Sequence, residues 1–163
     1  MSENKYTPPQ TPEELVLTWI KRVRESQFSH HHCVEFYKVV HFAIGVPATI
    51  LTAIVGTSIF KVATSSPNSS PSYLIISLSI LAAILSGLQT FLNVQAKINA
   101  HKIAADKFSE IRRDLEEAYA TSQINATLIS AAKTKYNNAT QNAPDVSSSV
   151  FSKITTILYK SPQ

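Results

Sequence analysis

The chain has 163 residues, of which 16% are charged, and a net charge of +4 at pH 7. No Asp, Glu, Lys or Arg occurs between Lys38 and Lys61 or between Lys61 and Lys97, whereas a helix of a soluble protein shows charges on its wet face every few residues. The basic residues flank these apolar runs instead of gathering in one patch, which argues against nucleic acid as a partner.

The N-terminal part is predicted to form a disordered segment over residues 1–11 and an amphipathic helix over residues 12–38. Thr11 can cap this helix, Pro12 suits its first position, and Glu14 can close a capping box. An apolar stripe then recurs at spacings of four and three residues, and nothing breaks the helix before residue 39. The stripe consists of Val16, Ile20, Val23, Gln27, His30, Val34 and Tyr37.

Two apolar runs follow, residues 39–60 and 73–94, and each exceeds the length of about 18 residues that marks a transmembrane candidate. Backbone groups in lipid must form hydrogen bonds within their own segment, so both runs are expected to be helical. Residues 61–72 are rich in serine and contain Pro67 and Pro71, which predicts a short connecting loop. The fold class is therefore predicted as an all-α membrane protein with a two-helix transmembrane hairpin. The loop also contains a glycosylation acceptor pattern at Asn68.

Lysine and arginine residues predict the orientation of the hairpin in the membrane. Close to the two runs, four of them precede the first and five follow the second, against Lys61 alone in the loop. By the positive-inside rule, both termini are expected in the cytoplasm and the loop on the other side. The single cysteine, Cys33, excludes an internal disulfide and suits a reducing compartment. The basic residues are Lys21, Arg22, Arg24 and Lys38 before the first run, and Lys97, Lys102, Lys107, Arg112 and Arg113 after the second.

The region after the second run is predicted to be helical as well. Residues 95–120 repeat the spacing of four and three, so this helix and the helix over residues 12–38 should pack together in a stalk or bundle. Residues 121–163 form a helical tail, with a break predicted over Asn137–Pro144. A short amphipathic helix around Val150–Leu158 could lie on the inner leaflet or pack on the stalk.

Small and polar residues mark the candidate sites inside the two runs. Small residues at a spacing of four let helices approach closely in lipid, and polar groups in a span face a partner helix or a water-filled cavity. Hydrogen bonding between helices and pore lining both remain open, and pore lining requires an oligomer. The candidate packing residues are Gly45, Gly56, Ala83 and Gly87, with Pro47 as a candidate hinge. The candidate polar residues are His41, Thr49, Thr52, Ser79, Ser86, Gln89 and Asn93.

No cofactor, metal site or catalytic activity is expected. Four consecutive residues, His30 to Cys33, cannot all point at one metal ion from a helix. Only His30 and Cys33, joined by His101, are spaced so that they could bind the same ion. Packed or solvated side chains are the simpler interpretation of this cluster. The sequence contains no glycine-rich phosphate loop and no nucleophile elbow. We therefore expect a protein that is not an enzyme.

The order of four segments resembles the SLATT family, the SMODS- and SLOG-associating two-transmembrane effector domains. The segments are His41–Pro47, Ala53–Phe60, Leu85–Leu92 and Ala100–Tyr119. The resemblance implies a membrane effector that assembles into pores when a nucleotide-sensing partner is activated. The pores would then kill or arrest an infected cell. The family-like positions in this chain are Gly45, Pro47, Gly56, Gln89, Phe91 and Arg112.

Two functions from different classes follow from these patterns. The first is an oligomeric, pore- or channel-forming membrane effector, whose partners are the lipid bilayer and other copies of the chain. The second is a non-conducting, membrane-anchored scaffold of a viral or envelope complex, which binds a protein partner through its cytoplasmic helices. A soluble helical bundle is the third alternative, and extraction that requires detergent would exclude it.

Overall fold

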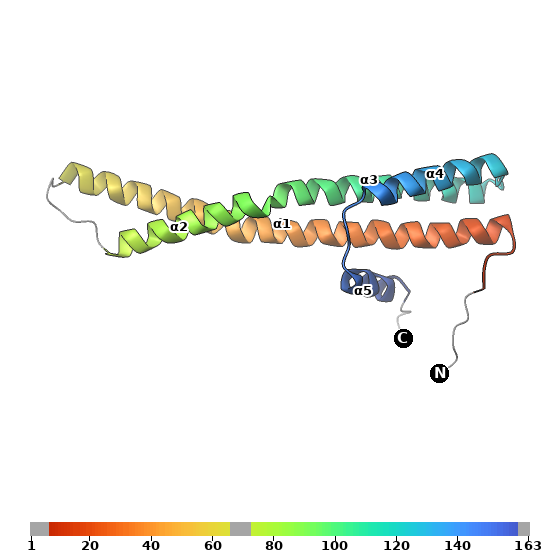
Figure 1. Cartoon of the computed structure of the whole chain (residues 1–163), viewed down its shortest axis with the longest axis horizontal. Helices are drawn as coiled ribbons and strands as arrows, with labels where there is room; N and C mark the ends of the chain where they lie inside the picture. The colour runs from red at the N-terminus through yellow and green to blue at the C-terminus, as the bar shows by residue number, and fades with distance from the viewer. Residues whose placement is uncertain (1–6, 66–72, 160–163) are drawn as a thin grey trace, which may run out of the picture. The chain divides into compact units, whose positions relative to one another are not determined.

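The computed structural model describes residues 7–65 and 73–159, and within these ranges it contains five α-helices (Figure 1). The chain divides into two compact units. The bundle unit comprises Met1–Val34 and Asn99–Gln163, and the hairpin unit comprises Glu35–Ile98. The helices are α1 (Pro12–Ser65), α2 (Tyr73–Leu92), α3 (Val94–Ala120), α4 (Ala126–Asn142) and α5 (Ser148–Tyr159). The all-helical fold class is thus confirmed for the described residues.

Helix α1 begins where the sequence predicts. The Thr11 hydroxyl accepts a hydrogen bond from the Glu14 N–H at 3.2 Å, which caps the first turn. The Glu14 carboxylate accepts from the Gln10 N–H at 2.7 Å, one residue before the cap, and so fixes the incoming chain. As expected, nothing interrupts the helix before the first apolar run.

The end of α1 differs from the prediction. The helix continues through residues 61–65, which the sequence assigned to the connecting loop. Residues 61–65 contain neither glycine nor proline, so nothing in their sequence ends the helix before Ser65. Residues 66–72, with the glycosylation acceptor at Asn68, lie outside the described residues.

A break separates α2 from α3, where the sequence predicted continuous helix. Asn93 has a φ of 42°, in the left-handed region that asparagine tolerates better than most residues. Its N–H donates to the Thr90 carbonyl at 3.3 Å, and its own carbonyl accepts from Ala96 N–H at 3.1 Å. Asn93 therefore closes α2 and opens α3 within a single residue.

Because of this backbone conformation, two substitutions of Asn93 should differ in their free energy of unfolding. Because glycine occupies the left-handed region freely and alanine does so at a cost of about 1–2 kcal/mol, Asn93→Ala should unfold about 1 kcal/mol more easily than Asn93→Gly. Unfolding of the two variants in the same detergent measures this difference. Equal stabilities would show that α2 and α3 are continuous.

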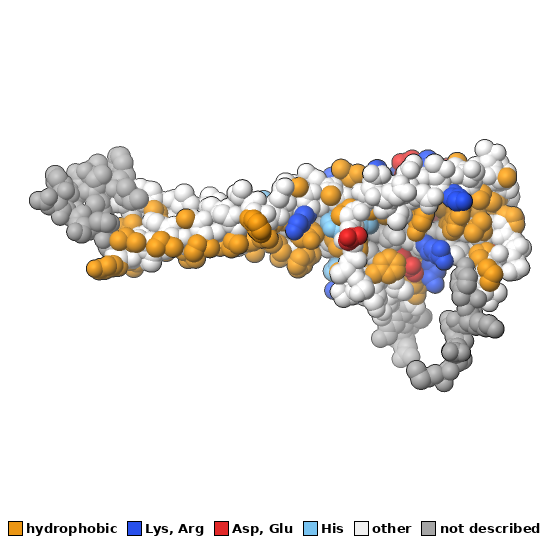
Figure 2. All heavy atoms as spheres, in the orientation of Figure 1, with side chains coloured by type: hydrophobic (Ala, Val, Ile, Leu, Met, Phe, Trp, Pro, Cys, Tyr) orange, Lys and Arg blue, Asp and Glu red, His pale blue; other side chains and the backbone are white. Residues whose placement is uncertain are grey.

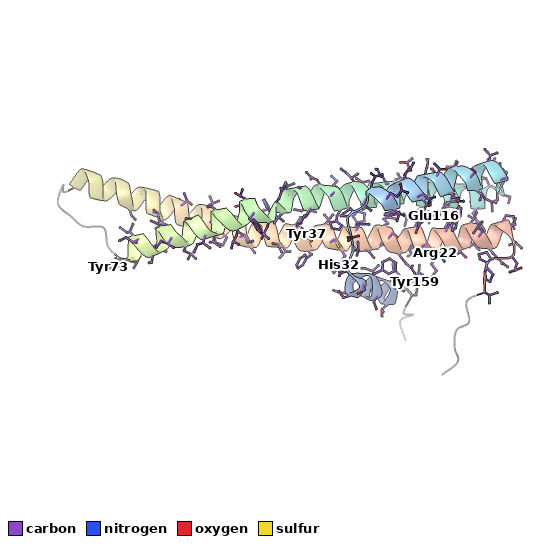
Figure 3. The ribbon with its side chains drawn as sticks, viewed as in Figure 1. Arg22, His32, Tyr37, Tyr73, Glu116 and Tyr159 are labelled. Atoms are coloured by element: carbon purple, nitrogen blue, oxygen red, sulfur yellow. The ribbon has the colours of Figure 1, made fainter. Side chains whose placement is uncertain are left out.

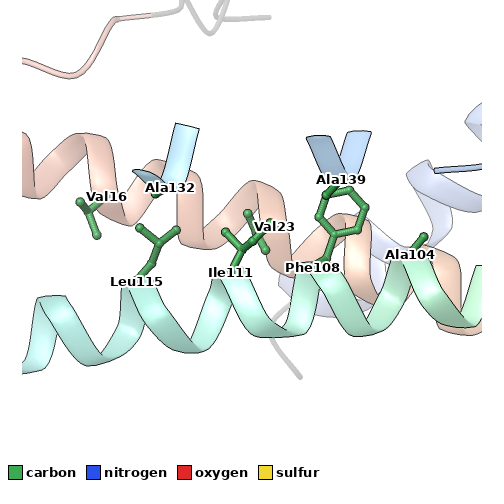
Figure 4. Packing of buried hydrophobic residues seen from close by; sticks show 8 residues of the cluster. All are labelled: Val16, Val23, Ala104, Phe108, Ile111, Leu115, Ala132 and Ala139. Carbon is green, nitrogen blue, oxygen red and sulfur yellow. The ribbon is translucent and has the colours of Figure 1, made fainter. Parts of the chain in front are cut away.

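The bundle unit has one hydrophobic core, formed by α1, α3 and α4 (Figure 4). Helix α3 supplies the central row of side chains, because Phe108, Ile111 and Leu115 recur at helical spacing on one face. Trp19, the only tryptophan, packs against this core. The buried members are Val16, Val23, Ala104, Phe108, Ile111, Leu115, Ala132 and Ala139.

Helix α4 runs through part of the break that the sequence predicted. It is capped by the Asn125 side chain, which accepts from Leu128 N–H at 2.8 Å, and it ends at Asn142. Residues 137–142 remain helical because Ala139 is buried in the core, so tertiary packing overrides the low helix propensity of the two asparagines. The chain leaves the helix only at Ala143, just before Pro144.

One lysine joins α4 to α3 on the surface. Lys135 Nζ lies 2.8 Å from both Glu110 Oε1 and Asp114 Oδ2. Hydrogen bonds to Asp114 and then Glu110 raise the pKa of Lys135 above its ordinary value. The three side chains are about half exposed, so water screens the pair and its contribution to stability is small.

Helix α5 packs within the bundle unit, which is one of the two arrangements considered for it. Ile154 is buried, and Lys21 Nζ from α1 lies 4.5 Å from the centroid of the Tyr159 ring. Figure 3 shows the Tyr159 side chain on α5. Burial is the largest cause of the raised pKa of Tyr159. This contact joins the last described turn of the chain to its first helix.

The hairpin unit consists of the C-terminal part of α1, α2 and the first turn of α3. Among its described apolar side chains, Ala48, Ala82, Val94 and Ile98 are buried, and most large apolar residues are exposed (Figure 2). Both helices are long and apolar enough to cross a membrane. Exposed side chains of this type include Phe42, Ile50, Ile54, Ile80 and Ile84.

Candidate functional site

A groove of about 320 Å³ lies in the hairpin unit, where Gln89 of α2 meets α1. It brings together Gln89, His41 and Thr49 of the predicted polar residues, with the predicted packing residue Gly45. The remaining lining residues are Phe42, Val46 and Ile50, all from α1. Polar groups from two helices therefore meet inside an otherwise apolar surface.

The absence of a side chain at Gly45 creates the space for Gln89. A Cβ atom built at Gly45 would lie 3.4 Å from the Gln89 Nε2 atom, at the short end of ordinary van der Waals contact. The glycine therefore lets the carboxamide lie directly against the backbone of α1. A larger residue at position 45 would push the carboxamide out of the groove.

Two polar groups of the groove lack hydrogen-bond partners. The Nδ1 atom of His41 is buried and has no partner among the described residues. The Gln89 carboxamide likewise makes no hydrogen bond within the described part of the chain. A buried polar group without a partner costs about 1–3 kcal/mol, and this cost applies to the His41 Nδ1 atom; Gln89 is half-buried.

Three hydroxyl groups among the predicted polar residues behave differently. Thr49 donates to the Gly45 carbonyl at 2.9 Å, Thr52 to Ala48 at 2.8 Å, and Ser79 to Ile75 at 2.8 Å. Each hydroxyl is thus satisfied by its own helix four residues earlier. Among the described lining residues of the groove, Gln89 and His41 are the polar residues whose side chains are not satisfied in this way.

Four of the predicted polar residues lie outside the groove. Thr52, Ser79, Ser86 and Asn93 are absent from its lining. Ser86 and Asn93 are exposed, and the backbone of Asn93 forms the helix break. The sequence pattern placed all four on the same faces as His41 and Gln89, but it could not show which of them the other helix would approach.

The small residues divide into two groups. Cβ atoms built at Gly56 and Gly87 would meet nothing within 4 Å, and Ala83 is exposed. Packing within the hairpin therefore uses Gly45 but not these three residues. The small residues that it buries are Ala48 and Ala82. Ala48 follows Gly45 by three residues, a spacing that could have identified it.

Pro47 lies inside α1, and the helix continues through it. Proline has no N–H, so the carbonyl of Ala43 loses its usual helical donor at this point. The residue is exposed beside the groove-lining residue Val46. A hinge at Pro47 stays a prediction.

In the bundle unit, the structure pairs two histidines, His30 and His101, which the sequence analysis had grouped only as candidate metal ligands. The Nδ1 atoms of His30 and His101 lie 2.9 Å apart, and both side chains are buried. The His30 ring stacks on Phe108, with centroids 5.6 Å apart. No group of three or more His, Cys, Asp or Glu residues in the described chain could hold a metal ion.

Burial makes this pair resist protonation. Desolvation, repulsion by His101 and repulsion by His31, in that order, lower the pKa of His30 to about 4. Burial also lowers the pKa of His101. Cys33, three residues after His30, is a buried thiol whose pKa burial raises.

The stability of the bundle unit should therefore fall with acidification. Histidines of the unfolded chain take up protons near pH 6.5 whereas His30 in the folded state does so only near pH 4, so the unfolded state binds more protons between these values. Stability should be complete above about pH 6.5 and should fall by about 1 kcal/mol between about pH 8 and about pH 5.5.

Unfolding followed by Trp19 fluorescence at several pH values measures this effect. His31→Gln is the matched control: His31 is exposed, so its loss should leave most of the pH dependence in place, whereas His30→Phe should reduce it. A stability that stays constant from pH 8 to about pH 5.5 would contradict the pairing of His30 with His101.

Comparison with protein-family models, with curated proteins and with solved structures finds no match.

Proposed function

We propose that the chain is a two-span membrane effector of the SLATT type, in which several hairpins assemble into a pore or channel. The observation that carries this proposal is the groove of the hairpin unit, where Gln89 and His41 have no partners. The family assignment rests on the sequence resemblance of residues 41–60 and 85–119.

The energetic reason is the cost of leaving polar groups in lipid. An unsatisfied group in hydrocarbon costs several kcal/mol, and two such groups face one groove. A neighbouring hairpin can satisfy them by hydrogen bonds, and water can satisfy them if several hairpins surround a channel. Both solutions require more than one copy of the chain, since two helices cannot enclose a pore.

The outer surface of the hairpin supports the bilayer as its environment. Large apolar side chains are exposed along both helices, at positions such as Ile54, Leu74 and Ile84. In water, an exposed apolar surface of this extent would promote aggregation, whereas in lipid it is the ordinary surface of a transmembrane helix. Gly56 and Gly87, open within the hairpin, would let neighbouring hairpins approach closely.

We assign both termini to the cytoplasm. The nine lysines and arginines that flank the two spans, against Lys61 in the connection, support this orientation. The bundle unit would then lie on the cytoplasmic side, where a nucleotide-sensing or other protein partner could reach it and trigger the pore.

Release of an encapsulated dye from liposomes tests the proposal. The purified full chain, reconstituted at increasing protein-to-lipid ratios, should release the dye with a steep dependence on that ratio, because several copies form each pore. Empty liposomes treated with the same detergent serve as the control. Release that stays at the level of this control at every ratio would overturn pore formation.

A non-conducting membrane-anchored scaffold is the second candidate function. It is favoured by the bundle unit, which has its own hydrophobic core of α1, α3 and α4 and exposes apolar residues such as Leu17, Ile103 and Tyr119. A scaffold predicts a stable protein partner and no dye release. The liposome experiment therefore separates the two functions.

A further inference from the structure

The charged residues of the hairpin unit are few and mostly positive. The unit contains Lys38, Lys61 and Lys97 against Glu35 alone, which gives a net charge of +2. No Asp or Glu occurs from residue 36 to residue 105. Cation channels are lined by rings of Asp or Glu, whereas rings of Lys or Arg belong to pores for anions. The charged side chains of this unit therefore suit a path for anions.

Lys97 is held against α1 close to the groove of the hairpin unit. Its Nζ atom lies 5.6 Å from the centroid of the Tyr37 ring, a distance at which the face of the ring attracts an ammonium group. Tyr37 precedes the groove-lining residue His41 by one helical turn. Lys97 is exposed and forms no ion pair with a described residue. Its positive charge is therefore not neutralised near this end of the groove.

The single carboxylate of the unit is paired with the other lysine at this end. Lys38 Nζ lies 2.8 Å from Glu35 Oε1, one turn away on α1, and both side chains are exposed. Lys38 precedes Gly45 by two helical turns, so the pair lies on the side of α1 that carries the groove. Because the two charges cancel at a distance, Lys97 determines the sign of the electrostatic field here.

The uncharged groups of the groove can contact ions of either sign. The Gln89 carboxamide offers N–H donors to an anion and an oxygen atom to a cation. The Thr49 hydroxyl donates its hydrogen to the Gly45 carbonyl, so only its oxygen lone pairs remain for an ion. These groups carry partial charges, and the full charge of Lys97 outweighs them at a similar distance.

We propose that the pore formed by these hairpins conducts anions in preference to cations. The inference rests on the proposed function, because Lys97 side chains surround one path only where several hairpins assemble. Such a ring attracts each anion that passes and repels each cation. One charge about 4 Å from an ion changes the local concentration of that ion about fivefold even in bulk water. Chloride permeability should therefore exceed potassium permeability at least about fivefold.

The zero-current potential of the full chain in planar lipid bilayers tests this selectivity. Bilayers of phosphatidylcholine carry no net charge, so they add no preference for either ion. With a gradient of KCl across the bilayer, the sign of the potential shows whether chloride or potassium carries most of the current. The wild type should give a chloride-to-potassium permeability ratio of at least about five.

Substitutions at position 97 connect the preference to this residue. Lys97→Gln should bring the permeability ratio close to one, and Lys97→Glu should make the pore prefer potassium. Glu35→Gln is the matched control, because it removes a charge from the same unit but leaves Lys38 positive, so the preference for chloride should persist or increase. Both positions are exposed, so all three variants should insert in the same amount as the wild type.

The possible failures are distinguishable. A wild-type current that prefers potassium, or that has no preference, would overturn the anion selectivity and leave the pore in place. The same preference for chloride in the wild type and in Lys97→Glu would also overturn it, because the charge at position 97 would then not determine the sign. A wild type without any current would overturn the proposed function itself, and this inference with it.

Discussion

Replacing Gln89 by leucine should lower dye release from proteoliposomes at least tenfold. Leucine has a similar volume but no hydrogen-bonding group, so the substitution removes the polar group that we assign to the pore or to the contact between hairpins. Because apolar side chains are stable in lipid, the variant should still insert and fold. The loss should therefore appear in release and not in the amount of protein incorporated.

Thr90→Leu is the matched control for this prediction. Thr90 is the next residue on α2, is exposed, and donates its hydroxyl hydrogen to the Ser86 carbonyl at 3.1 Å. It needs no partner from outside its helix, so this variant should keep at least half of the wild-type release. An equal loss in both variants would show that any leucine on this segment disturbs the protein, and that Gln89 has no special role.

Replacing Leu115 by alanine should destabilise the bundle unit by about 3 kcal/mol. Leu115 is completely buried, and removal of such a side chain costs about 2–5 kcal/mol through lost transfer free energy and the cavity that remains. Trp19 packs against the same core and is the only tryptophan, so its fluorescence reports unfolding of this unit while the helices in detergent stay formed.

Ile103→Ala on the same helix is the control for Leu115→Ala. Ile103 is 56% exposed, so its truncation should change the free energy of unfolding by less than about 0.5 kcal/mol. Similar losses in the two variants would mean that α3 does not present its Leu115 face to the core.

The periodicity of the sequence was sufficient to predict the helices but not all of their ends. The capped start at Thr11 and the apolar stripe from Val16 to Val34 depend on neighbours along the chain, so a local pattern predicts them. The continuation of α4 to Asn142 depends on burial of Ala139 against another helix, and low local propensity hid it. The break at Asn93 depends on one backbone angle, for which asparagine is only a weak signal.

In the candidate site, too, the sequence predicted what depends on one helix but not what depends on contacts between helices. The sequence could place His41, Gly45 and Thr49 on one face of a helix, because their spacing of four is a property of that helix alone. It could not show that Gln89 would lie against Gly45, since this contact depends on the register between two helices. The sequence grouped His101 with His30 as candidate metal ligands, but it could not show that their rings would pair directly, because 71 residues separate them in the chain.

Disulfide cross-linking in native membranes tests most directly the claim that another copy of the hairpin covers the groove. Cys33 is the only cysteine, so Cys33→Ser gives a background in which one new cysteine reports one position. Thr49→Cys in the groove should give an oxidant-dependent ladder of dimers and larger species, whereas Ile54→Cys, on an exposed apolar part of α1, should remain mostly monomeric. A monomer in both variants, or equal ladders from both, would contradict the account.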